Sequence, residues 1–127
     1  MISMGCTTST TVQETLISPK EFEALIAGLE AGKEPEWVIL DVRRDDEIKA
    51  KRLPSVNAKG ATVPLLYHEL STLEGAASKL PKNKLLYCFC RSGNRSGKAS
   101  ELLRTKGFNT INVEGGILAL DHIAVSG

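Results

Sequence analysis

Hydrophobic residues in this chain gather in short blocks that are separated by polar stretches. Two of these blocks, residues 37–40 and 85–89, are continuous apolar runs, which are typical of strands buried on both faces of a parallel sheet. Shorter blocks at residues 55–58 and 110–113 predict two further strands. The long runs end abruptly in residues that carry chemistry, so the ends of these strands are the first place to look for a functional site.

Between the predicted strands, apolar residues recur at the three- and four-residue spacing of helices. The first helix begins with Ser18, Pro19 and Glu21, which form a capping box with proline at the first helical position, and it ends at Gly32. Further helices are predicted over residues 44–51, 65–80 (interrupted near Gly75), 97–106 and 116–123. Helices that alternate with strands throughout the chain predict an α/β fold with a parallel sheet.

Length and composition describe an ordinary globular protein. The 127 residues are enough for one domain with its own core, and the 42% hydrophobic content is typical of such a domain. A net charge of +1 argues against nucleic acid as a partner, and no apolar run approaches the ~20 residues that span a bilayer. Residues 1–16 are polar and rich in threonine, so we expect a flexible N-terminal lead-in before a single domain over residues 17–127.

The three cysteines, Cys6, Cys88 and Cys90, do not form a disulfide framework. Cys88 and Cys90 are two residues apart at the end of a predicted strand, so a bond between them would be strained. Two histidines and no Cys-x-x-C pair predict neither a metal site nor a cofactor. A reduced cytoplasmic setting is favoured. Because Met4-Gly5-Cys6 resembles a lipid attachment signal, a lipid-anchored or periplasmic form stays an alternative.

The candidate chemistry lies in the polar loop after residues 85–89. Cys90 stands between a strand and a helix, where backbone N–H groups and the helix N-terminus supply partial positive charge. Arg91 and Arg95 add two formal charges within the same few residues. All of these effects favour the thiolate, which is the nucleophilic form of cysteine. We therefore predict that Cys90 is a catalytic nucleophile and not a buried structural cysteine.

The loop Cys90-Arg-Ser-Gly-Asn-Arg-Ser96 resembles the active-site loop of the rhodanese (thiosulfate sulfurtransferase) family in its single-domain form. A second block, Trp37 to Arg43 followed by Glu47, resembles the strand and Asp-Val-Arg motif of that family. The order and spacing of the blocks agree over residues 17–121. The resemblance implies a three-layer α/β fold in which helices flank a central, mostly parallel five-stranded sheet.

The resemblance also implies sulfur transfer. Cys90 would attack the outer sulfur of a donor such as thiosulfate and hold it as a persulfide, which a thiol or cyanide acceptor then removes. Because the donor, the thiolate and the persulfide are all negatively charged, the residues after Cys90 are expected to form an anion-binding loop. That loop consists of Arg91, Ser92, Gly93, Asn94, Arg95 and Ser96.

Residues outside the loop are expected to support it. Asp41 would tie down neighbouring loop N–H groups, and Arg43 would pair with Glu47 across one helical turn. Arg95 could brace the loop by pairing with an acid instead of binding the donor. Cys88 is expected to pack in the core, with a resolving thiol as the sharper alternative.

Two other functions use similar residues. A sulfur-relay or regulatory module would hold a persulfide on Cys90 and pass it to an acceptor protein, with little turnover of small molecules. Lys49, Lys51, Arg52 and Lys59 could then form a docking face for an acidic partner. A cysteine phosphatase or arsenate reductase is less favoured, because only four residues separate Cys90 from Arg95 where that motif has five. The sequence does not identify the physiological donor, the acceptor or the oligomeric state.

Overall fold

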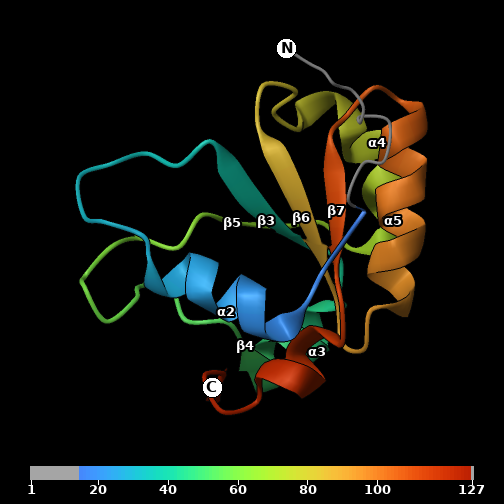
Figure 1. The fold of residues 1–127 in the computed structure, drawn as a ribbon. Helices are drawn as coiled ribbons and strands as arrows, with labels where there is room; N and C mark the ends of the chain where they lie inside the picture. Colours follow the sequence, from blue (N-terminus) through green and yellow to red (C-terminus); the bar gives the residue numbers. More distant parts are fainter. Residues whose placement is uncertain (1–14, 127) are drawn as a thin grey trace.

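The computed structural model describes residues 15–126. At its centre lies a five-stranded sheet with the strand order β2-β7-β6-β3-β5, in which every neighbouring pair is parallel (Figure 1). These strands are β2 (Leu16–Ile17), β3 (Trp37–Asp41), β5 (Leu65–Tyr67), β6 (Leu85–Phe89) and β7 (Thr110–Val113). The predicted α/β fold with a five-stranded parallel sheet is confirmed.

Helices cover both faces of the sheet (Figure 1). One face packs against α2 (Pro19–Ala27) and the 3-10 helix η3 (Gly116–Leu120). The other face packs against α5 (Asn94–Thr105), α4 (Leu73–Ala76) and η2 (Ala77–Lys79), with η1 (Leu70–Thr72) beside them. The short helix α3 (Asp45–Ala50) follows β3. Directly after α3, strand β4 (Lys51–Arg52) pairs in antiparallel with β8 (Val125–Ser126) and forms a separate two-stranded sheet.

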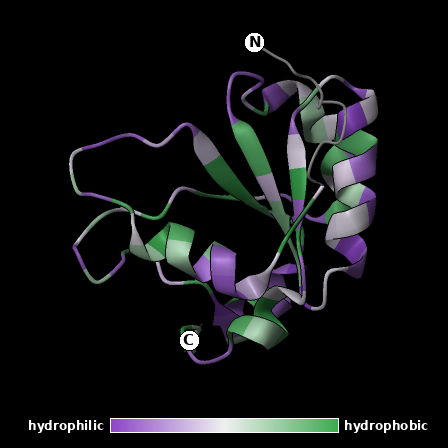
Figure 2. Ribbon diagram, in the orientation of Figure 1, coloured by the Kyte–Doolittle hydropathy of each residue, from purple (hydrophilic) through white to green (hydrophobic). Residues whose placement is uncertain are grey.

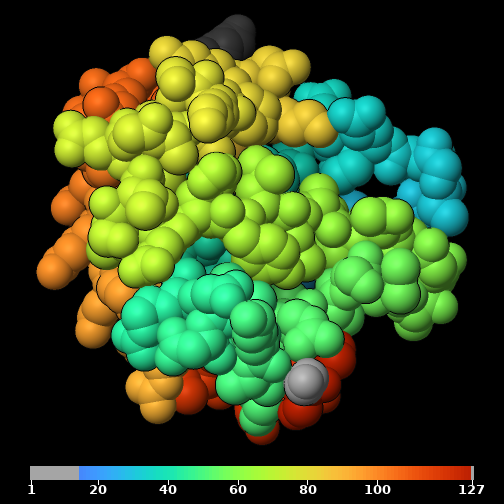
Figure 3. Space-filling view, turned by 180° about the vertical axis from the view of Figure 1, so that it is seen from behind, coloured from blue at the N-terminus to red at the C-terminus, as the bar shows by residue number. Residues whose placement is uncertain are grey.

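The core has two apolar layers because successive side chains of a strand point to opposite faces. Ile39, Tyr87 and Phe89 pack on the face of α2, whereas Leu40 and Cys88 pack on the face of α5. The hydrophobic colours of β3 and β6 in Figure 2 follow from this burial on both sides. From behind, the segment from β5 to η2 covers the middle of the molecule, above α3 (Figure 3). The two central strands are therefore shielded on both faces.

The first helix ends earlier than the sequence predicts. α2 begins as expected, with the Ser18 side chain accepting a hydrogen bond from the Glu21 amide and Pro19 in the first turn, but it ends at Ala27 and not at Gly32. The Asn57 side chain donates to the carbonyls of Ile26 and Leu29 at 2.9 and 2.8 Å. A side chain about thirty residues away therefore caps this helix, which no local pattern shows.

Two predictions in the middle of the chain are wrong. Residues 65–67 form strand β5 and not the start of a helix, because they pair in parallel with residues 39–41 at the edge of the sheet. Only residues 70–79 of that segment are helical, in three short pieces. Residues 55–58 form a loop closed by a single Val56–Thr62 bridge, because the Asn57 side chain accepts hydrogen bonds from the amides of Lys59 and Ala61.

Within residues 15–126 there is no helix with the length and apolar character that crossing a bilayer requires. The Met4-Gly5-Cys6 signal and most of the expected N-terminal lead-in lie outside the described residues. The domain boundary at residue 17 stays a prediction. Within the described residues the first strand is β2, which pairs with β7 at one edge of the sheet and which the sequence pattern did not reveal.

Candidate active site

The candidate site is the loop between β6 and α5, at the carboxyl edge of the sheet. β6 delivers Cys90 to this edge, and α5 begins four residues later. Gly93 has φ +103°, a left-handed conformation that favours glycine, and a Cβ there would lie 3.3 Å from the Gly115 nitrogen. The loop can therefore turn sharply and still pack closely against the segment that follows β7.

The helix η3 orients this loop by holding its carbonyl groups. The amides of Ile117 and Leu118 donate to the carbonyls of Cys90 and Arg91 at 3.0 and 3.1 Å. Gly116 permits the approach, because a Cβ at that position would collide with both carbonyl oxygens. Since the carbonyls face η3, the amide groups of the loop remain available on its inner side.

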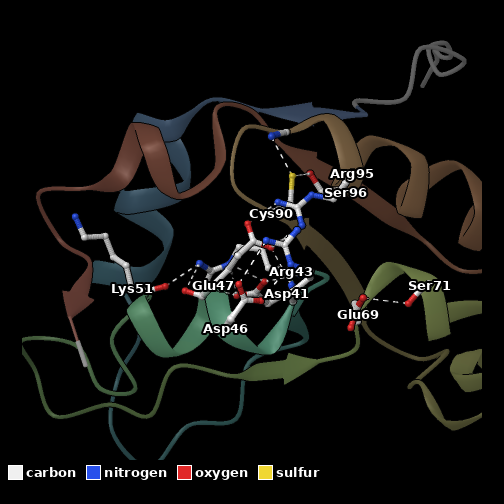
Figure 4. A network of polar contacts seen from close by, with 12 residues as sticks. Asp41, Arg43, Asp46, Glu47, Lys51, Glu69, Ser71, Cys90, Arg95 and Ser96 are labelled. Atoms are coloured by element: carbon white, nitrogen blue, oxygen red, sulfur yellow. Dashed lines mark hydrogen bonds and ion pairs between the residues drawn. The ribbon is translucent and has the colours of Figure 1, made fainter.

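The sulfur of Cys90 lies inside this loop and has no exposed surface. It accepts hydrogen bonds from the Gly93 amide at 3.1 Å and from the Ser96 hydroxyl at 3.3 Å (Figure 4). Burial raises the pKa of the Cys90 thiol, but the Ser96 hydroxyl and the amides of residues 96, 93 and 92 outweigh burial, and the pKa lies below its ordinary value. The surroundings therefore favour the nucleophilic thiolate.

Arg95 is held by an acid. Its guanidinium binds the Glu47 carboxylate through two hydrogen bonds of 2.7 and 2.8 Å (Figure 4). This contact with Arg95 is the main reason why the pKa of Glu47 falls to about 2. Arg95 thus braces α5 against α3, as the alternative interpretation of the sequence anticipated, and its positive charge is shared with an acid beside the cysteine loop.

Asp41 and Arg43 form a buried ion pair with each other, which the sequence did not predict. The Arg43 guanidinium binds Asp41 at 2.9 Å, both side chains being almost fully buried, and it donates to the Lys51 carbonyl at 2.7 Å. Arg43 does contact Glu47, but through the Glu47 backbone carbonyl at 3.3 Å. The predicted pairing of the two side chains is wrong, because Arg95 occupies the Glu47 carboxylate. The Asp41 carboxylate accepts from the Arg43 side chain and also from the Arg43 backbone amide at 3.1 Å, which is the contact with a neighbouring loop N–H that the sequence predicted. Both residues serve to hold the end of β3 and α3.

The remaining loop residues lie at the surface. Arg91, Ser92 and Asn94 are exposed, and Arg91 borders a cavity of about 230 Å³. That cavity is lined by Arg43, Glu47, Ala50, Lys51, Arg91, Ile117, Leu118 and Asp121. A larger cavity of about 580 Å³ runs along α5 and touches the loop only at Gly93 and Asn94. Of the two loop arginines, Arg91 is therefore the one placed toward solvent beside the loop.

Asn112 contacts the site but was not predicted from the sequence. Asn112, on β7, has its Oδ1 2.5 Å from the Ser96 hydroxyl, as a second possible acceptor for that group, and its Nδ2 donates to the Gly93 carbonyl at 3.1 Å. The available signal was weak: a polar residue next to the last position of a short apolar strand. Its contacts depend on the parallel pairing of β7 with β6, which sets Asn112 opposite Cys88.

Cys88 shares a face with Cys90 but is a poor candidate for a resolving thiol. Both cysteines are free thiols, and burial raises the pKa of Cys88 to about 11. Its environment is that of a core residue. In residues 15–126, no cluster of three or more histidine, cysteine, aspartate and glutamate side chains could hold a metal ion.

Comparisons with known proteins agree with this geometry. The fold and site define an α/β protein with a cysteine between a central strand and a helix. The family model of the rhodanese-like domain matches residues 18–121, and the chain belongs to this family. In the crystal structure of a rhodanese-like domain protein from Staphylococcus aureus, 89% of that chain and 83% of this one align with a TM-score of 0.66 and 27% identity.

Two sequence relatives bear on the chemistry. The Bacillus subtilis (strain 168) protein named "Putative sulfurtransferase YtwF" is 34% identical over 85 residues, which cover 66% of this chain and 73% of that protein. A tRNA uridine(34) hydroxylase from Albidiferax ferrireducens is 31% identical over 110 residues, but the match spans 82% of this chain and only 31% of the hydroxylase. The family and the first of these relatives support sulfur transfer as the general chemistry.

Proposed function

We propose that this protein is a sulfurtransferase that moves a sulfane sulfur from a donor such as thiosulfate to a thiol or cyanide acceptor through a persulfide on Cys90. The observation that carries the proposal is the environment of the Cys90 sulfur. It accepts hydrogen bonds from the Gly93 amide and the Ser96 hydroxyl at the carboxyl end of β6. A cradle of donors around a buried sulfur suits a nucleophile that is negatively charged before and after reaction.

In the first half-reaction, the Cys90 thiolate attacks the outer sulfur of thiosulfate. A bond forms between the Cys90 sulfur and the outer sulfur, while the bond between the two sulfurs of thiosulfate breaks. Sulfite leaves with the electron pair of that bond, and the outer sulfur of the persulfide carries one negative charge. Because the thiolate forms without help from a base, a separate general base is not required.

In the second half-reaction, an acceptor thiolate attacks the outer sulfur of the persulfide. A new sulfur–sulfur bond forms on the acceptor, and Cys90 leaves as the thiolate that began the cycle. Arg91 is exposed beside the loop, and its positive charge would attract the anionic donor.

The alternatives differ in what the site offers. A sulfur-relay module would use the same Cys90 persulfide with an acceptor protein, and the hydrogen bonds to the sulfur suit both functions. The basic face suggested for such a partner is partly neutralised, because Lys49 pairs with Asp45 and Lys51 with Asp121. A phosphatase would need the Arg95 guanidinium to bind the oxyanion. Both terminal nitrogens of that guanidinium already donate to the Glu47 carboxylate.

The proposal is tested by the mass of the intact protein after incubation with thiosulfate, followed by a chase with cyanide or a small thiol. We expect a gain of one sulfur that the chase removes, in the wild type and in Cys88→Ser but not in Cys90→Ser. Failure to gain sulfur from any sulfane donor would refute the proposal. Sulfur that is loaded but not released to small thiols would favour the relay module.

A further inference from the structure

The Ser96 hydroxyl stands between two hydrogen-bond acceptors. It lies 3.3 Å from the Cys90 sulfur and 2.5 Å from Oδ1 of Asn112. A serine hydroxyl carries a single proton, so it can donate to only one of these acceptors at a time. The two contacts therefore compete for the same proton.

The orientation of the Asn112 amide is fixed by its other end. Its Nδ2 group donates to the Gly93 carbonyl at 3.1 Å, and a carbonyl can only accept, so Oδ1 must face Ser96. The amide is thus a fixed acceptor beside the hydroxyl.

We propose that Asn112 is a positioning residue that competes with Cys90 for the Ser96 proton and so sets the balance between the thiolate and persulfide states. The inference rests on the proposed sulfur transfer. When the charge lies on the Cys90 sulfur, Ser96 donates to that sulfur, and its oxygen then faces Oδ1 of Asn112 without a proton between them. This arrangement is unfavourable at such a short distance.

When the persulfide forms, the negative charge moves to the outer sulfur and the sulfur of Cys90 becomes neutral. The Ser96 hydroxyl can then donate its proton to Oδ1 of Asn112. The two oxygens are then joined by a hydrogen bond and no longer repel each other. Asn112 therefore favours the state in which the Cys90 sulfur is uncharged, and it opposes the free thiolate. Loss of this acceptor should increase ionisation of the Cys90 thiol.

Other charged groups near the thiol come from several elements. Arg95 of α5 is paired with Glu47 of α3, Asp41 is paired with Arg43 at the end of β3, and Arg91 lies on the loop itself. No residue of η3 carries a charge. Asn112→Leu leaves all of these charged groups in place and adds none, so a change in ionisation in that variant reports on the hydrogen-bond network.

The test compares two substitutions of similar size, Asn112→Leu and Asn112→Asp, in the full chain. Both variants lose the hydrogen bond from the Asn112 amide to the Gly93 carbonyl, so this loss does not distinguish them. Leucine removes the acceptor, and we expect the acid dissociation constant of the Cys90 thiol to rise about two- to tenfold, the size of one neutral hydrogen bond. Aspartate keeps the acceptor and adds negative charge, and we expect that constant to fall.

The thiolate is followed by its ultraviolet absorbance against pH, with each variant also carrying Cys90→Ser as the blank. In a Ser96→Ala background, Asn112→Leu should no longer raise the dissociation constant, and circular dichroism checks the fold. Asn112→Val replaces the leucine variant if that one does not fold. Shifts of the same sign in both variants, or a rise that persists without Ser96, would overturn the inference. The readout needs no sulfur donor, so its failure is separate from failure of the sulfur transfer.

Discussion

Glu47 shows how a single side chain couples α3 to the candidate active site. Its carboxylate accepts two hydrogen bonds from Arg95 and one from the Arg44 amide. The Arg95 contact lowers the pKa of Glu47 from the ordinary 4.5 to about 2. A carboxylate whose pKa is lower in the folded state stabilises that state above its ordinary pKa, and this contribution disappears as the pH falls toward the folded value.

We therefore expect Glu47→Gln to lower the free energy of unfolding by about 1–3 kcal/mol at pH 7. The difference from the wild type should shrink as the pH falls from 4.5 to about 2, because the wild-type carboxylate is then protonated. Urea denaturation at several pH values measures both effects. Glu74→Gln, whose carboxylate is exposed and 4.0 Å from Lys106, serves as the control. An equal loss of stability at all pH values would contradict this account.

At the scale of elements, η3 and the cysteine loop form one unit although they are far apart in the chain. Gly116 has φ +53°, and its α-carbon lies against the carbonyl groups of Cys90 and Arg91. The carbonyls of Cys90 and Arg91 accept the amides of Ile117 and Leu118 because η3 begins at this point. The shape of the cradle around the sulfur therefore depends on a glycine that follows β7.

Gly116→Ala should lower the free energy of unfolding by about 2–4 kcal/mol and reduce the rate at which Cys90 gains sulfur, because the loop must move away from the new methyl group. Gly60→Ala is the matched control, since Gly60 also has a positive φ of +78° but has no atom within 4 Å of its added Cβ. Chemical denaturation and the sulfur-loading mass measurement compare the two. If both variants lost the same stability, backbone conformation alone would explain the effect.

At the scale of the whole molecule, the Asp41–Arg43 pair connects the central sheet to the segment that surrounds the site. Arg43 lies 5.7 Å from the centre of the Phe89 ring on β6, and it holds the Lys51 carbonyl at the end of α3. Both charges are buried, so each depends on the other for its stabilisation.

Asp41→Asn should lower the free energy of unfolding by about 3–5 kcal/mol, because the Arg43 guanidinium stays buried without its anion. Asp45→Asn breaks the exposed pair with Lys49 and should change stability little. Thermal and urea unfolding of both variants provide the measurement. A mild effect of Asp41→Asn would show that the pair is not needed to hold β3 and α3 together.

The sequence by itself determined the features that depend on local patterns. The continuous apolar runs predicted β3 and β6, the capping residues predicted the start of α2, and the change of pattern at Cys90 predicted a cysteine between a strand and a helix. Each of these follows from residues within one turn or one strand of each other. Strand propensity, capping and charge act over that range.

Only the tertiary structure decided which distant groups meet. Pairing with β3 made residues 65–67 a strand, and the Asn57 side chain ended α2 early. The partners of Arg95 and of Ser96, namely Glu47 and Asn112, come from segments 48 and 16 residues away. Such contacts depend on strand order and register in the parallel sheet, where long crossovers bring separate segments to one edge. A local pattern of residues does not contain that information.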